Sequence, residues 1–394
     1  IGSVFMIIGQ FPIQGYLKFM AHTFGPHWNV VIQQITYASF DLMGLIAVIG
    51  ISYNLTKSYG DVAPLPAALV AMCGFFLTIP FSMHKDGTFW IPLDQLGSTG
   101  LFIAIIIGLF LTDLYVWMVH KKITIKMPAS VPPAVSDSFT ALFPGFFCLL
   151  LVWVIRMGVS FTPIETIPNL MQFIFKPLSV VGTSLPGALI CEFLVSFLWI
   201  FGIHGANVVS GVMTAIWLAA MQQNAVAFAA HKALPNIVTQ QFFDNFVHIG
   251  GSGATLGLAI MMIMFAKSDE YKTLAKLEIA PAFFNINEPL VFGFPVVMNP
   301  FIAVPFIVAP LLNVLITYFA MASGIVAKTI GIMVPWTTPA IISGYLATGH
   351  ISGAVLQAVL IAVDSLVYVY FFKKADKRKV QAQMANAKKA ETQA

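Results

Sequence analysis

The sequence predicts an all-α fold, namely a polytopic α-helical membrane protein with about ten transmembrane helices and re-entrant hairpins. Composition is the first observation behind this prediction. Hydrophobic residues make up 58% of the 394 residues and charged residues only 9%, whereas a soluble domain carries about a quarter charged residues. The mean hydropathy is +0.87. Lipid rather than water is therefore the expected solvent for most of this chain.

Long apolar runs are the second observation, because a run of about 18 residues or more can span a bilayer as a helix. Such runs lie near residues 1–22, 31–53, 64–82, 97–119, 141–159, 187–221, 245–266, 299–320 and 351–372. The run 187–221 is too long for one crossing of about 20 residues. We therefore expect it to cross the membrane and fold back.

Basic residues in the connecting loops are the third observation, because Lys and Arg in short loops stay on the cytoplasmic side. The basic groups are Lys57; Lys121, Lys122 and Lys126; Lys267, Lys272 and Lys276; and the tail residues Lys373, Lys374, Lys377, Arg378, Lys379, Lys388 and Lys389. An even number of crossings between these groups requires that segment 283–298 and the region around Trp336 do not cross completely. The pattern thus predicts re-entrant segments in the second half and a cytoplasmic C-terminal tail.

Polar residues interrupt the apolar pattern at three places in the second half. They are "FFNINEPLVFGFPVVMNP" with Glu288, "WIFGIHGANVVSG" with His204, and "VPWTTP" with Trp336. Irregular backbone at membrane depth persists only where protein or a wet cavity pairs its polar groups. Pro289 disfavours helical geometry at the preceding residue, so "NINEP" is expected to form a non-helical tip.

Ionisable residues inside a membrane are functional candidates, because a charge at mid-helix costs about 2.5–3.5 kcal/mol on insertion scales. Each candidate also has a structural alternative. The Glu288 carboxyl could bond to amides of its own turn, and His204 could be a packing histidine between two glycines. Trp199 and Trp336 could mark a membrane interface without binding anything.

Four further polar residues stay undecided at this stage. Asn245, Asp244 and His248 in "FFDNFVHIGGSG" could line a site or form a helix entry at the surface. Asp364, inside the last apolar run, could be a buried counter-charge or a site residue.

A sugar matches the chemistry of these candidates. A carboxylate accepts hydrogen bonds from neighbouring hydroxyls, asparagine both donates and accepts, and an indole covers the apolar C–H face of a pyranose. A cation would recruit more acidic groups or rings of carbonyls, and an anion would recruit arginine. An uncharged, hydroxyl-rich ligand is therefore expected.

Several other chemistries are not expected on this chain. Cys73, Cys148 and Cys191 are far apart in apolar runs and are interpreted as small buried hydrophobic residues. The sequence contains no "GxxxxGK[ST]" loop for ATP, and "GGSGATLG" is better explained by close helix packing. The basic tail 373–394 is interpreted as a solvated helix or coil rather than a nucleic-acid patch. We expect no metal, no cofactor and no catalytic residue here.

Four motifs in order carry a family resemblance: "FGIHGA", "GGSGATLGL", "NINEPLVFGFPVVMNP" and "VPWTTP". Together with "MPASVPPAVSDSFTALFPG" at 127–145, they resemble the membrane-embedded IIC permease of the bacterial phosphoenolpyruvate-dependent sugar phosphotransferase system, lactose/cellobiose/diacetylchitobiose family. The likeness covers nearly the whole chain, and the opening residues of the family domain are not represented.

The resemblance implies a homodimer in the bacterial cytoplasmic (inner) membrane. Residues 1–160 would form a dimerisation and scaffold domain, residues 161–372 a sugar-binding transport domain, and residues 373–394 a cytoplasmic tail. Glu288 and His204 would bind the hydroxyl that becomes phosphorylated, and Asn287, Trp336, Trp199 and Asn245 would complete the substrate site. The substrate would be a β-linked disaccharide: diacetylchitobiose or cellobiose, or else lactose.

The same resemblance implies a separate IIB protein, with IIA upstream, whose phosphocysteine supplies the phosphoryl group. Two other classes remain open. An ion-coupled secondary sugar transporter also uses broken midplane helices, with Glu288 and Asp364 as coupling groups. A membrane-embedded enzyme acting on lipid-linked sugar would use Glu288 and His204 as acid and base.

Overall fold

The computed structural model describes residues 5, 8–9, 14–39, 41–83, 86–97, 100–125, 133–294 and 296–393. Apart from loops, these residues form helices and one small antiparallel ribbon, β1 (Ser82–Met83) with β2 (Phe89–Trp90). The chain divides into two compact units, one of residues 1–2 and 34–178 and one of residues 3–33 and 179–394. The predicted helical class is confirmed.

Five described helices are long and apolar enough to cross a membrane. They are α6 (Leu101–His120), the Phe139–Ser160 part of α7 (Pro133–Ser160), α10 (Gly205–Ala229), α14 (Pro300–Ala322) and the Ile351–Ala385 part of α16 (Ile351–Gln393). The bent pair α8 (Ile167–Gly182) and α9 (Leu185–Ile200) gives a sixth if it counts as one span.

The expected number of about ten spans is not confirmed. Two of the expected runs form helices shorter than a full crossing: α5 (Pro64–Thr78) has 15 residues and α11 (Leu256–Phe265) has 10. Among the described residues, an apolar run thus does not always form one full-length helix, because the run is shared between a short helix and the turns beside it.

The first unit is a helix bundle built from α4 (Met43–Tyr59), α5, α6, α7 and most of α8, with a short 3₁₀ turn, η1 (Leu93–Gln95). Its core includes Val48, Phe75 and Ala104. Small polar residues join two of these helices, because the Thr112 hydroxyl donates to the Ser52 hydroxyl at 2.6 Å. Such contacts are typical of helices that pack in lipid.

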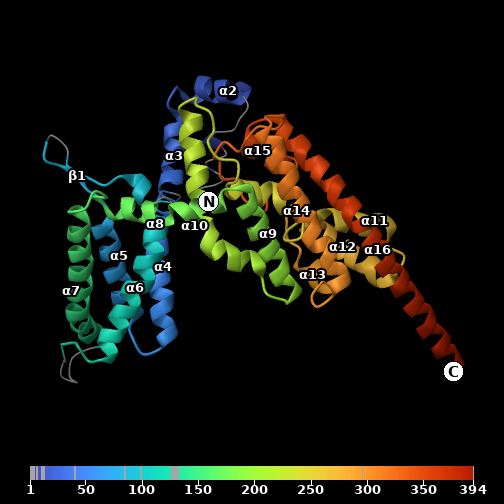
Figure 1. The fold of residues 1–394 in the computed structure, drawn as a ribbon, viewed down its shortest axis with the longest axis horizontal. Coiled ribbons are helices and arrows are strands. Elements are labelled where there is room, and N and C mark those ends of the chain that lie inside the picture. Colours follow the sequence, from blue (N-terminus) through green and yellow to red (C-terminus); the bar gives the residue numbers. More distant parts are fainter. Residues whose placement is uncertain are drawn as a thin grey trace. The chain divides into compact units, whose positions relative to one another are not determined.

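The second unit contains the remaining elements (Figure 1). In chain order they are α2 (Gln14–Phe24), the first part of α3 (Trp28–Tyr37), α9, α10, the π-helix η2 (Phe242–Val247), α11, α12 (Asp269–Phe283), α13 (Glu288–Gly293), α14, α15 (Ile342–Thr348) and α16. Helix α9 packs on α10 and α14, and α16 packs on α11, α14 and α15.

Two of the predicted interruptions appear as predicted. The run 187–221 is divided between α9 and α10, which meet at a turn where Gly202 has a φ of +76°. A Cβ on Gly205 would lie 2.0 Å from the Val195 carbonyl oxygen, so only glycine permits this approach. The backbone from 327 to 339, which contains "VPWTTP", is irregular.

The tip around Glu288 differs in one respect from the prediction. Residues 284–287 are non-helical as expected, but Glu288 is the first residue of α13. Proline is tolerated in the first turn of a helix, where its missing N–H would have no intrahelical partner. Pro289 therefore starts a short helix rather than extending the tip.

Candidate functional site

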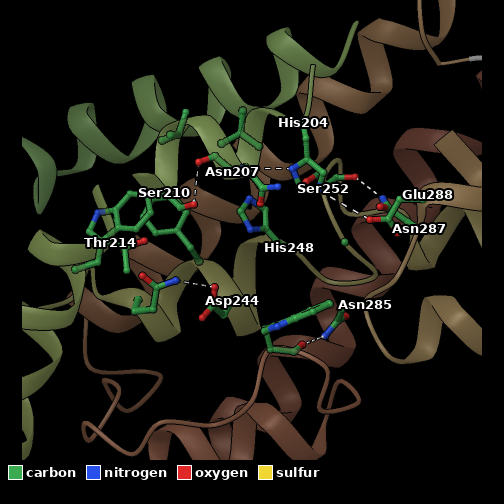
Figure 2. Close-up of a pocket in the computed structure, with 18 residues that line it drawn as sticks. His204, Asn207, Ser210, Thr214, Asp244, His248, Ser252, Asn285, Asn287 and Glu288 are labelled. Atoms are coloured by element: carbon green, nitrogen blue, oxygen red, sulfur yellow. Dashed lines mark hydrogen bonds and ion pairs between the residues drawn. The ribbon is translucent and has the colours of Figure 1, made fainter. Parts of the chain in front are cut away.

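A cavity of about 420 Å³ lies in the second unit and collects most of the polar candidates. Its size falls within the range of small-molecule sites. Its polar lining consists of His204, Asn207, Ser210, Thr214, Gln240, Asp244, His248, Ser252, Asn285, Asn287 and Glu288, and its aromatic lining of Trp217, Phe243 and Trp336. In Figure 2, His248 stands between Glu288 and Asn287 on one side and Ser210 and Thr214 on the other.

His204 and Glu288 face each other across the pocket, with His204 Nε2 3.9 Å from Glu288 Oε1. This distance is too long for a hydrogen bond between them. His204 is the N-cap of α10, and its Nδ1 accepts a hydrogen bond from the backbone N–H of Asn207 at 3.3 Å. An accepting Nδ1 places the proton of a neutral imidazole on Nε2. One hydroxyl could therefore accept from His204 and donate to Glu288.

The two asparagines of "NIN" hold the tip to the rest of the pocket. Asn285 accepts from the Gly250 amide at 2.7 Å, and its side-chain amide donates to the Trp336 and Thr338 carbonyls. The Asn287 amide donates to the Ser252 carbonyl at 2.7 Å and to Thr255 Oγ1 at 2.9 Å. Both side chains line the pocket, but their amide groups are already used in hydrogen bonds to the surrounding protein.

The glycine-rich stretch 250–257 combines two roles. Gly257 packs against α16, where an added Cβ would lie 2.6 Å from the Ser365 nitrogen, as expected for close helix packing. Gly251 has a φ of +92°, and a Cβ there would lie 2.5 Å from Asn287 Cγ. Left-handed backbone of this kind favours glycine. The glycine-rich loop therefore packs closely against the Asn285–Asn287 segment.

A second imidazole is fixed by a carboxylate that the sequence analysis did not single out. His248 Nε2 lies 2.6 Å from Glu192 Oε2, and Glu192 is fully buried. Ser196 donates to the other Glu192 oxygen at 3.1 Å. Glu192 is a charged residue within the apolar run 187–221, so the cost of intramembrane charge was the available signal.

Asp244 and His248 belong to the pocket, which decides a question the sequence left open. The Asp244 carboxylate accepts from the Gln240 side-chain amide at 2.9 Å. Both residues come from the η2 region, where the π-helix ends at Val247. They are therefore lining residues rather than a surface helix entry.

Four other candidates take different places. Trp336 lines the pocket and is 54% exposed. Trp199 is buried behind His204, with ring centroids 4.6 Å apart, and is not among the lining residues. Asn245 is also outside the pocket, because η2 turns its side chain onto Gln241 at 2.7 Å. Asp364 is buried elsewhere, beside Asn313.

A further carboxyl, Glu278, lies near the site on α12, which is not among the candidate spans. It is fully buried. Burial, and to a smaller extent the neighbouring Glu288 carboxylate, raise the pKa of Glu278 from 4.5 to about 7, against a lowering effect of the Leu290 backbone. Glu278 therefore retains its proton at pH values where an exposed glutamate has lost it.

The lining chemistry favours a neutral polyhydroxylated ligand. The described lining includes carboxylates, imidazoles, amides, hydroxyls and aromatic rings but no lysine or arginine. Across the described residues no three His, Cys, Asp or Glu side chains are grouped to hold a metal ion. Fold and site together define a membrane-embedded protein with a pocket suited to sugar hydroxyls.

The chain belongs to the phosphotransferase system EIIC family, whose model matches residues 1–310. It is thus a sugar permease component and a multi-pass protein of the bacterial inner membrane. A similar solved structure is that of the transporter ChbC, the IIC component from the N,N'-diacetylchitobiose-specific phosphotransferase system. It shares 45% identity and a TM-score of 0.91, over 97% of this chain and 91% of that one.

Two curated relatives are also similar over nearly the whole chain. The lichenan permease IIC component of Bacillus subtilis (strain 168) is 48% identical over 97% of this chain and 86% of its own length. The cellobiose-specific EIIC component of Geobacillus stearothermophilus is 44% identical over 98% of this chain and 88% of its own length.

Proposed function

We propose that this permease binds a β-linked disaccharide and carries it across the membrane for phosphorylation. Diacetylchitobiose and cellobiose are the preferred candidates, and lactose is the alternative. The observation that supports this proposal most directly is the His204–Glu288 pair, in which His204 Nε2 and Glu288 Oε1 lie 3.9 Å apart. The pair is too far apart to bond directly and close enough to share one ligand oxygen. The substrates named for the similar proteins, cellobiose and N,N'-diacetylchitobiose, agree with this substrate class.

In this proposal the hydroxyl to be phosphorylated accepts from His204 Nε2–H and donates to the Glu288 carboxylate. The exposed Trp336 ring, already at the pocket wall, covers the apolar face of one pyranose. These contacts bind and orient the hydroxyl oxygen that will attack phosphorus. Trp199 contributes indirectly, because it packs against the His204 ring.

The phosphoryl donor in this proposal is a phosphocysteine on a separate IIB protein, itself supplied by IIA. Cys148 and Cys191 are buried as expected, whereas Cys73, on the apolar helix α5, is exposed. None of these three cysteines lines the described pocket. A homodimer in lipid, with the basic tail of α16 in the cytoplasm, completes the proposal.

Transport measurements separate this function from its rivals. Purified protein in liposomes should bind and slowly exchange unmodified disaccharide without any ion gradient. Phosphorylated sugar should appear only when IIB, IIA and phosphoenolpyruvate with the upstream phosphotransferase proteins are supplied. An obligatory proton or sodium gradient would favour an ion-coupled transporter instead. A cleaved glycosidic bond in the products would favour an enzyme.

The proposed orientation has its own test. Lys57 lies at the end of α4, Lys121 and Lys122 follow α6, Lys267 precedes α12, and Lys373 lies in α16. Single cysteines at these positions, in a background without the native cysteines, should react with impermeant reagents only from the cytoplasmic face. Labelling of one group from outside would contradict the shared orientation and the re-entrant interpretation of segment 283–298.

A further inference from the structure

Helices α14 and α16 pack against each other (Figure 1), and a second buried polar cluster lies between them. It consists of Asn313 and Thr317 on α14 and Asp364 on α16, and all three are fully buried. Asn313 and Thr317 are four residues apart, so they share one face of α14. None of the three lines the described pocket.

The cluster has more hydrogen-bond acceptors than donors. The Asn313 amide donates to Asp364 Oδ2 at 3.1 Å and to the Val247 carbonyl at 3.3 Å, which uses both of its hydrogens. Asp364 Oδ1, Asn313 Oδ1 and Thr317 Oγ1 are buried without a hydrogen-bond partner among the described residues. Unpaired buried polar atoms are rare and call for an explanation, such as a bound ion.

No basic side chain on the described helices around Asp364 would compensate the charge of an ionised carboxylate. Helices α11 and α14 contain no Lys, Arg or His, and the first basic residue of α16 is Lys373, nine positions after Asp364. His248, which follows Val247, is paired with Glu192 at 2.6 Å. An isolated carboxylate in an apolar interior is very costly unless a positive charge accompanies it.

We propose that Asp364, Asn313 and Thr317 bind a monovalent alkali cation, Na⁺. One cation would neutralise the carboxylate and be shared by the unpaired oxygens of Asp364 and Asn313, whose side chains are in contact, and of Thr317, one turn further along the same face of α14. A proton on Asp364 Oδ1 would instead pair that oxygen with one further acceptor, and the Thr317 hydroxyl has a hydrogen of its own to donate, so a sodium titration must separate a bound cation from a protonated carboxyl. A divalent ion would leave excess positive charge in the membrane interior, since the cluster holds a single carboxylate.

The location indicates what the cation does. η2 ends at Val247, whose carbonyl already belongs to this cluster, and broken helix ends are known places for Na⁺ binding. One turn after Asp364, the Tyr368 hydroxyl donates to the Gly253 carbonyl at 2.6 Å. The cation would therefore hold α14 and α16 together close to the glycine-rich loop 250–257, and so stabilise the fold. This inference does not depend on the proposed sugar or on IIB.

Thermal unfolding of the purified full chain without sugar tests the proposal. Ligand linkage predicts a Tm that rises with the logarithm of Na⁺ concentration, compared with choline chloride at equal ionic strength. Radioactive sodium should bind at one ion per chain. Asp364→Asn should lose this binding, and Thr317→Val should bind sodium about tenfold more weakly, the effect of about 1.4 kcal/mol.

Two variants control for the loss of a hydroxyl, which is part-buried at Ser365 and buried at Thr112. The Ser365 hydroxyl bonds to the Ile361 carbonyl at 2.8 Å, and the Thr112 hydroxyl, in the other unit, bonds to Ser52. Ser365→Ala and Thr112→Val should keep the sodium-dependent shift. Identical Tm values in sodium and choline, with no sodium bound to the parent protein, would overturn the proposal. If Asp364→Asn does not fold, Thr317→Val and the parent protein still decide the question.

Discussion

Changing Glu288 to glutamine removes the charge of this side chain and keeps its shape, so it isolates the hydrogen bond proposed to the sugar hydroxyl. His204→Ala removes the facing donor. The 3.9 Å separation places both groups within reach of one oxygen. Each variant should therefore weaken binding of the disaccharide, and the two losses should not be independent.

The magnitude follows from the exposure of the two groups. A hydrogen bond to a charged group contributes about 1.5–3 kcal/mol. The His204 and Glu288 side chains are 39% and 49% exposed, so water screens the interaction. The lower end of that range corresponds to about tenfold in affinity for each variant. Because both groups serve one hydroxyl, the double variant should lose about tenfold less than the product of the single losses.

Isothermal titration of cellobiose and diacetylchitobiose into detergent-purified protein measures these losses. Glu270→Gln is a matched control, since Glu270 is exposed and paired with Lys379 at 2.8 Å, away from the pocket. A disaccharide lacking the bound hydroxyl should bind poorly to the parent and respond little to either variant. Parental affinity in both single variants, with each variant still folded, would refute the role of Glu288 and His204.

Three further changes test other parts of the site. Because Glu278 has its pKa raised from 4.5 to about 7, the folded protein holds a proton that the unfolded chain loses in this window. Stability should fall as pH rises from 4.5 to about 7, and thermal unfolding of Glu278→Gln should lack this fall. Glu192→Ala strands His248 and should lower the free energy of unfolding by about 3 kcal/mol in denaturant titrations; a loss no larger than that of Ser196→Ala would contradict the pairing. Gly251→Ala, whose Cβ would lie 2.5 Å from Asn287 Cγ, should weaken sugar binding in the same titrations. Gly158→Ala, with open space around the Cβ, should not.

Polar residues in apolar surroundings were the most informative sequence signal. Glu288, His204 and Trp336 stand out in the sequence because each lies in an interruption of an apolar run, and the structure brings them to one pocket. The signal works because lipid makes unpaired polar groups costly, so such groups are collected where they can be satisfied. The cost of unpaired polar groups in lipid therefore indicates which residues belong to a site, but not which groups they bond to.

The sequence could not predict which way individual side chains point or which distant residues pair with each other. Asn245 and Asp244 are adjacent, yet only Asp244 lines the pocket, because the π-helix sets which side each side chain takes. Glu192 and His248 are 56 positions apart, and no local periodicity links them. The number of spans is not confirmed for a related reason, since hydropathy measures the apolarity of a run and not where a helix breaks.

The amides of Asn285 and Asn287 have a consequence for how substrate preference can change. They are bonded into the backbone of the glycine loop and the "VPWTTP" segment, so altering them alters the shape of the whole pocket. Ser210, by contrast, uses its hydroxyl only on its own helix, at the Asn207 carbonyl. A protein with this architecture can exchange such residues to accept a different sugar while its frame, and therefore its folding, stays the same.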